Sequence, residues 1–166
     1  MSKILCFSRN RFTGVEMAGE DTMRSVCRVQ DTLFEAGVEI LVRLPDLEIV
    51  EVRGEIRRSR NGTELDVAGD LQKVTGSRVG PGIKKIVRGL IDGAPDAEKL
   101  AAMLEECANG IIMSFTKDVL KGAPEDWTGE KEFFAAMVRA NPRLYNSCAA
   151  LSADSPLMEG LELDKI

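Results

Sequence analysis

The residues best suited to bind a ligand lie in a glycine-rich stretch, VTGSRVGPGIKK, at residues 74–85. An apolar and basic run follows the glycines and predicts a helix that begins near Pro81. The N–H groups at the start of a helix attract phosphate and carboxylate groups. The stretch is therefore a candidate small-anion site. Its candidate residues are Gly80, Gly82, Arg78, Lys84, Lys85 and Arg88.

The competing interpretation is that these glycines only turn the chain between packed elements, while the cations lie on a solvated face. The spacing of Gly76, Gly80 and Gly82 does not match a nucleoside-triphosphate loop, because the lysine follows Ile83 rather than a glycine. The glycines also do not follow the first strand of a βαβ unit, as the dinucleotide fingerprint requires. The pattern favours the structural turn over the anion site.

Several residue types on which catalysis often depends are rare or missing. The 166 residues contain no histidine, which removes imidazole as a general base and as a metal ligand. The four cysteines, Cys6, Cys27, Cys107 and Cys148, lie far apart and form no C-x-x-C pair. An iron–sulfur cluster would have to be collected from the last three of them. We expect no cofactor and no metal, and the counts favour a non-catalytic protein.

Carboxylates remain as candidates for acid–base chemistry. Asp96, Glu98, Glu105 and Glu106 could supply a carboxylate pair for such chemistry or a site for a hard cation. Cys107 follows two of these acids and lies on the apolar face of the same helical pattern, so we expect it in the core, with a raised thiol pKa. Asp96 and Glu98 lie in the first turn of the same helix, where acids stabilise the helix dipole.

The charge balance argues against nucleic-acid and membrane partners. There are 22 basic and 27 acidic residues, a net charge of −5, so the overall field repels nucleic acid and anionic lipid. No apolar run is long enough to cross a bilayer or to form a signal peptide, so we expect a cytoplasmic protein. The basic residues along one predicted strand alternate with acids. This pattern is more typical of a charged face that prevents aggregation than of a surface that binds an acidic partner. The basic residues are Arg53, Arg57, Arg58 and Arg60.

The elements that would position these residues follow from hydrophobic periodicity. Alternating apolar residues predict strands at 25–30, 38–44 and 47–56, the last two paired as a hairpin. Residues 63–67 form either a further strand or the entry to the helices. Helical spacing appears at 83–91, 96–120 and 129–141.

Strands followed by helices indicate an α+β fold, in which a small antiparallel sheet in the N-terminal half is packed by C-terminal helices. We expect one domain over residues 1–145. Residues 146–166 form an acidic tail that is either docked or mobile.

Two segments, DTLFEAGVEILVRLPDLEIVEVRGEIRR at 31–58 and GDLQKVTGSRVGPGIKK at 69–85, resemble a bacterial family known only as a domain of unknown function. The resemblance extends from about residue 26 to 120 and implies a fold without an activity. Similar families carry Gly-Cys-x-His-Leu at the start of the long helix, and the order of elements is distantly similar to iron–sulfur scaffold proteins. Here that position reads GAPDAEKLAAM, which supplies neither thiolate nor imidazole.

Three functional hypotheses remain open. The first is a non-catalytic accessory or binding protein that forms a homo-oligomer, through a sheet edge or helix faces, or binds a protein partner, with a small-anion site at the turn. The second is a small enzyme acting on an anionic metabolite, held by Arg78, Lys84 and Lys85, with Glu106 as base. The third is an iron–sulfur or metal carrier.

Overall fold

A computed structural model describes residues 6–60, 67–91, 95–121, 131–140, 142–146 and 149–159. The chain divides into two compact units, Met1–Ile111 and Ile112–Ile166, and each is described by itself. These units are defined by internal contacts rather than by independent folding. The expected domain over 1–145 with a tail beyond it therefore stays a prediction.

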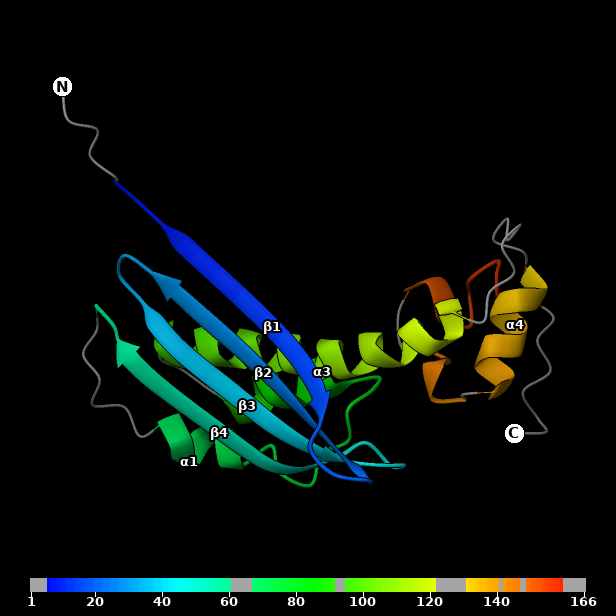
Figure 1. The fold of residues 1–166 in the computed structure, drawn as a ribbon, viewed down its shortest axis with the longest axis horizontal. Helices are drawn as coiled ribbons and strands as arrows, with labels where there is room; N and C mark the ends of the chain where they lie inside the picture. Colours follow the sequence, from blue (N-terminus) through cyan, green and yellow to red (C-terminus); the bar gives the residue numbers. More distant parts are fainter. Residues whose placement is uncertain are drawn as a thin grey trace. The chain divides into compact units, whose positions relative to one another are not determined.

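The first unit is built on a four-stranded antiparallel sheet whose strands are neighbours in chain order (Figure 1). The strands are β1 (Arg9–Met17), β2 (Thr22–Asp31), β3 (Glu35–Arg43) and β4 (Glu48–Arg58). The sheet occupies the N-terminal half of the chain and helices follow it, which confirms the α+β fold class. The strand expected at 25–30 is longer than its pattern indicated, and both strands of the expected hairpin are present.

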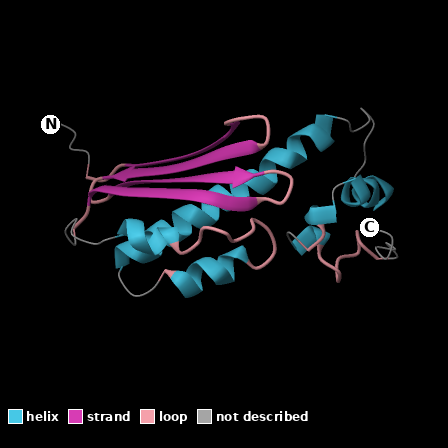
Figure 2. Ribbon diagram, turned by 90° about the horizontal axis from the view of Figure 1, so that it is seen from below, coloured by secondary structure: helices cyan, strands magenta, loops and turns pink. Residues whose placement is uncertain are grey.

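The helices of the first unit cover one face of this sheet (Figure 2). The side chains that the strands bury on that face are mostly apolar. Side chains alternate along β3, so that Val38, Ile40 and Val42 are buried while Glu39 and Leu41 on the opposite face are partly exposed. The apolar face packs against α1 (Val67–Gln72), α2 (Ile83–Leu90) and the first part of α3 (Pro95–Lys121). The buried face of α3 comprises Leu100, Leu104, Cys107 and Ile111.

The strand β1 was not predicted. Its sequence, RNRFTGVEM, contains a glycine and four charged or amide side chains, so the apolar alternation is broken. Pairing with β2 forms the strand instead, in a continuous register from Arg9 opposite Asp31 to Met17 opposite Met23. The Asn61-Gly62 turn and most of the ambiguous 63–67 segment lie outside the described residues; Val67 begins α1.

The second unit contains the rest of α3, the helix α4 (Lys131–Ala140) and the short 3-10 helices η1 (Pro142–Leu144) and η2 (Ala149–Leu151). The helical pattern at 129–141 is thus confirmed as α4. Its core contains Val138 from α4 together with Leu151 and Met158 from the expected tail. In the described ranges, no helix has both the length and the apolar character that crossing a membrane requires.

Candidate ligand-binding site

The glycine-rich turn before α2 makes internal hydrogen bonds. Gly82 directly precedes the helix with a φ of 87°, a left-handed conformation that glycine adopts without strain. The N–H of Ile83 donates to the Gly80 carbonyl at 3.1 Å, and the N–H of Lys85 donates to the Gly82 carbonyl at 2.9 Å. These amides close the turn, so they are less available to an anion than the sequence pattern suggested.

Two of the cations expected to hold the anion contact an acid instead. Arg88 Nε lies 2.8 Å from Glu105 Oε1, and Lys84 Nζ lies 3.7 Å from Glu105 Oε2. The Glu105 side chain is only 17% exposed, so these pairs fasten α2 to α3. Arg78 forms a β-bridge with Glu48, and Lys85 is exposed. The turn acts as a structural corner in these contacts, and an anion site there stays a prediction.

A pocket of about 330 Å³ that the sequence did not predict lies between β1, β2 and the first turns of α3. Its walls are mostly apolar, and four charged side chains line it. The apolar residues are Phe7, Val29, Leu33, Phe34, Ala102 and Met103. The charged residues are Arg9, Arg11, Asp31 and Lys99. The volume is in the lower part of the range typical of small-molecule sites.

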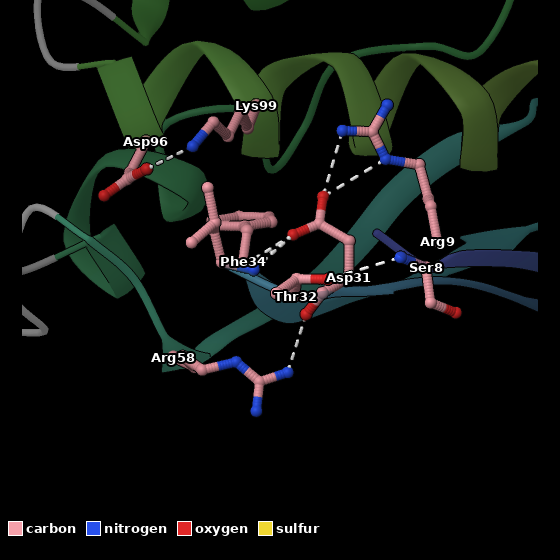
Figure 3. A network of polar contacts seen from close by, with 9 residues as sticks. Ser8, Arg9, Asp31, Thr32, Phe34, Arg58, Asp96 and Lys99 are labelled. Carbon is pink, nitrogen blue, oxygen red and sulfur yellow. Dashed lines mark hydrogen bonds and ion pairs between the residues drawn. The ribbon is translucent and has the colours of Figure 1, made fainter. Parts of the chain in front are cut away.

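Asp31 organises one side of this pocket (Figure 3). The N–H groups of Leu33 and Phe34 donate to its Oδ1 at 2.8 and 2.7 Å, which holds the turn after β2. Arg9 donates to its Oδ2 from Nε at 3.1 Å and from Nη2 at 3.0 Å. The hydrogen bond from Leu33 and the guanidinium of Arg9 hold the pKa of Asp31 below its ordinary value of 3.8, so this carboxyl stays ionised.

Lys99 on α3 approaches the same turn from the other side (Figure 3). Its Nζ lies 2.9 Å from Asp96 Oδ1 and 4.3 Å from the centroid of the Phe34 ring, a cation–π contact. Asp96 is fully buried at the start of α3 and also accepts a hydrogen bond from Ser59. The ammonium group is therefore fixed over an aromatic wall of the pocket.

Arg11 supplies the third cation. Two residues from Arg9 along β1, it lies on the same face of the strand, and its Nη2 is 2.9 Å from Glu106 Oε2 on α3. The side chains of Arg9, Arg11 and Lys99 are 60%, 47% and 48% exposed. A guanidinium has five N–H donors and an ammonium has three, so each cation keeps donors that its acid does not use. The pocket is thus an apolar cavity with a cationic rim.

The remaining candidates are placed elsewhere. Cys27 and Cys107 are fully buried, which confirms the expected place of Cys107 in the core. Burial raises the pKa of the Cys107 thiol to about 12. Cys148 lies outside the described residues. Within the described part of the chain, no three histidine, cysteine, aspartate or glutamate side chains gather as a metal-binding set. Glu106 pairs with Arg11 rather than with the cations of the turn.

The arginines of β4 pair with acids of the sheet. Arg53 Nε lies 2.5 Å from Glu51, Arg57 Nη2 lies 2.7 Å from Glu55, and Arg58 Nη2 lies 3.3 Å from Glu35. The next residue of the cluster, Arg60, is exposed. This pairing supports the interpretation of a charged face.

The fold and the pocket define an α+β module with an antiparallel four-stranded meander and an amphipathic pocket beneath its first two strands. Comparison of the chain with protein-family models, curated proteins and solved structures finds no match in any of the three. The resemblance to a bacterial family therefore stays a prediction, and the function has to be argued from the site itself.

Proposed function

We propose that this protein is a non-catalytic binding protein for a small organic anion, and that the pocket between β1, β2 and α3 holds the anion. The observation that carries this proposal is the cationic rim: Arg9, Arg11 and Lys99 all line one apolar pocket and are about half exposed. Each cation is held in position by an ion pair with an acid: Asp31, Glu106 and Asp96, respectively. Binding an anion therefore requires little reordering of these long side chains.

The walls indicate the kind of anion. Phe7, Leu33 and Phe34 present aromatic and aliphatic surface next to the charges. A free inorganic anion would leave that surface in water, whereas a carboxylate with an apolar body would cover it and gain about 25 cal/mol per Å² of apolar area removed from water. An apolar carboxylate fits both parts of the pocket.

Binding is favoured over acid–base catalysis by the state of the carboxylate in the pocket. Asp31 accepts hydrogen bonds from two backbone N–H groups and from Arg9, and its pKa is lowered. A general base works best when its pKa lies near the working pH, so Asp31 is poorly suited to accept a proton. The described contacts give no specific support to the enzyme or the iron–sulfur hypothesis. The cytoplasmic location expected from the sequence remains part of the proposal.

The test is titration calorimetry with benzoate, phenylpropionate and hexanoate, with their uncharged amides and with inorganic phosphate. We expect the carboxylates to bind more tightly than the amides and than phosphate. Arg11→Gln should weaken carboxylate binding roughly tenfold, because a charge-assisted hydrogen bond contributes about 1.5 kcal/mol or more. Lys99→Gln should act in the same direction.

The matched control is Lys84→Gln, which removes a cation from the turn before α2 and leaves the pocket intact. It should bind the carboxylates as the unmodified protein does. Loss of binding in Lys84→Gln but not in Arg11→Gln would place the site at the turn and contradict the pocket. Equal binding of the carboxylates and their amides would contradict the role of the cationic rim.

A further inference from the structure

The two edges of the sheet differ in how their backbone groups are satisfied. The edge of β4 is covered by the loop that follows α1: the N–H of Ile49 donates to the Ser77 carbonyl, the N–H of Gly76 donates to the Ile49 carbonyl, and both distances are 2.8 Å. Further along β4, Gln72 Nε2 of α1 donates to the Val52 carbonyl at 2.5 Å. This edge is closed by the protein itself.

The edge of β1 carries no comparable cover in the described part of the chain. β1 is nine residues long, has β2 as its only neighbour among the described strands and keeps a continuous register without a bulge. Within the described residues, the backbone of β1 makes no hydrogen bond outside that pairing. It also exposes Phe12 and Met17, at 56% and 53%. A long, regular edge strand with exposed apolar side chains is a template for another strand.

We propose that β1 pairs antiparallel with β1 of a second copy of this chain, about a two-fold axis at Thr13. The two-fold axis lies perpendicular to the sheet, so that helices stay on the same side of the joined sheet. Directly opposite residues in an antiparallel pair have their side chains on the same face of the sheet. The condition is therefore met only when odd-numbered residues of β1 face odd-numbered residues of the second copy, and even-numbered residues face even-numbered ones. Among them, the register centred on Thr13 pairs all nine residues, from Arg9 opposite Met17 of the second copy onward.

The side chains on the open face suit this register. Phe12 comes to lie opposite Gly14 of the second copy, and Gly14 opposite the second Phe12. The Phe12 ring already lies against its own Gly14, where a Cβ would be 2.8 Å from the ring Cζ. Each aromatic ring can thus cover a glycine of either strand, a pairing that stabilises strands in which glycine leaves a gap.

The charges on β1 also distinguish an antiparallel from a parallel partner. Arg9 and Arg11 lie near one end of the strand, and Glu16 lies near the other. An antiparallel copy brings the basic end of each strand beside the acidic end of its partner, and Asn10 opposite Glu16. A parallel copy would place arginines beside arginines. Because the interface is one strand wide, we expect weak association, with a dissociation constant on the order of micromolar.

The first test is sedimentation equilibrium of the full chain over a range of concentrations. The unmodified protein should show a monomer–dimer equilibrium, and Phe12→Lys should weaken it at least tenfold. Ile86→Lys, at an exposed apolar residue of α2, is the matched control and should leave the equilibrium unchanged. The proposal would be overturned if the protein stayed monomeric at concentrations up to about 100 times the expected micromolar dissociation constant. Equal dimerisation of Phe12→Lys and the unmodified protein would overturn it as well.

The register is tested separately by oxidative cross-linking in a Cys6→Ser, Cys148→Ser background, where the remaining Cys27 and Cys107 are buried. Asn10→Cys and Glu16→Cys alter two exposed positions that this register places opposite each other. A mixture of the two variants should form a covalent dimer, and neither variant alone should. Efficient cross-linking of Asn10→Cys to itself would refute the register. This experiment needs no ligand in the pocket, so the register can fail while the proposed anion binding stands.

Discussion

Replacing Gly54 of β4 by alanine tests how the sheet packs on α1. Gly54 lies on the face of β4 turned toward α1, and a Cβ at this residue would lie 2.1 Å from Leu71 Cδ1. No such distance is tolerated between carbon atoms, so Leu71 has to move. Its side chain is fully buried and cannot escape into solvent. The added methyl group must therefore displace core atoms or push α1 away from β4.

The magnitude follows from the known cost of overpacking. Inserting a methyl group into a well-packed core destabilises a protein by about 1 to 3 kcal/mol. Leu71→Ala alone should destabilise by about 2 to 5 kcal/mol, because it removes a buried leucine. In the double variant the new methyl group enters the space that Leu71 vacates. The double variant should therefore be more stable than the sum of the two single changes predicts, by about 1 kcal/mol or more.

The assay is urea unfolding followed by circular dichroism, with the change in free energy taken at constant slope. Gly89→Ala is the control, since a Cβ there meets nothing within 4 Å. It should stabilise α2 by up to about 1 kcal/mol, the difference in helix propensity. Strict additivity of Gly54→Ala and Leu71→Ala would refute the reasoning, because it would mean that the two side chains do not compete for one space.

The remaining predictions concern single groups. Gly82→Ala should destabilise the protein by about 1 kcal/mol in the same unfolding assay, because its φ of 87° is left-handed. Asp31→Asn should lower stability at neutral pH, because the ionised carboxylate is stabilised in the folded protein. The folded-state pKa of Asp31 lies below 3.8, so the difference in stability between the variant and the unmodified protein should disappear in thermal melts as the pH falls through this folded-state pKa. In a Cys148→Ser background, a thiol reagent should modify exposed Cys6 rapidly, and buried Cys107, whose pKa is about 12, only on unfolding. Because this pKa is raised, the free energy of unfolding should fall as the pH rises above 9, where the thiol ionises in the unfolded chain but not in the folded protein. The free energy of unfolding of Cys107→Ala should fall less over the same pH range than that of the unmodified protein.

The parts of the fold that the sequence predicted are those in which one periodicity dominates. Strands β3 and β4 each bury one side-chain face, so their apolar residues alternate over most of their length. The long helix α3 repeats Leu100, Leu104, Cys107 and Ile111 at helical spacing for the same reason. In β1, only Val15 and Met17 continue such an alternation, because this edge strand contributes little to the core. Its formation depends on β2, a contact between residues that are not adjacent in sequence.

The pocket could not be predicted because its charged residues come from distant segments. Arg9 and Lys99 are ninety positions apart in the sequence, and only the packing of α3 under β1 and β2 brings them to one pocket. One signal was nevertheless present. Arg9 and Arg11 are two residues apart, so recognising β1 as a strand would have placed both cations on one face. The glycine-rich turn gives the stronger signal in the sequence, because its residues are adjacent.

The pocket and the proposed dimer edge share the strand β1, so the two proposals are physically linked. Arg9 and Arg11 belong to the cationic rim, while Phe12 and Gly14 of the same strand carry the edge pairing. Pairing with a second copy would restrict the motion of β1 and hold the arginines in the position that an anion requires. If the bound anion stabilises the same strand conformation, each event favours the other by the same free energy, because linkage is reciprocal. An apolar carboxylate should then strengthen dimerisation by the factor by which dimerisation strengthens carboxylate binding.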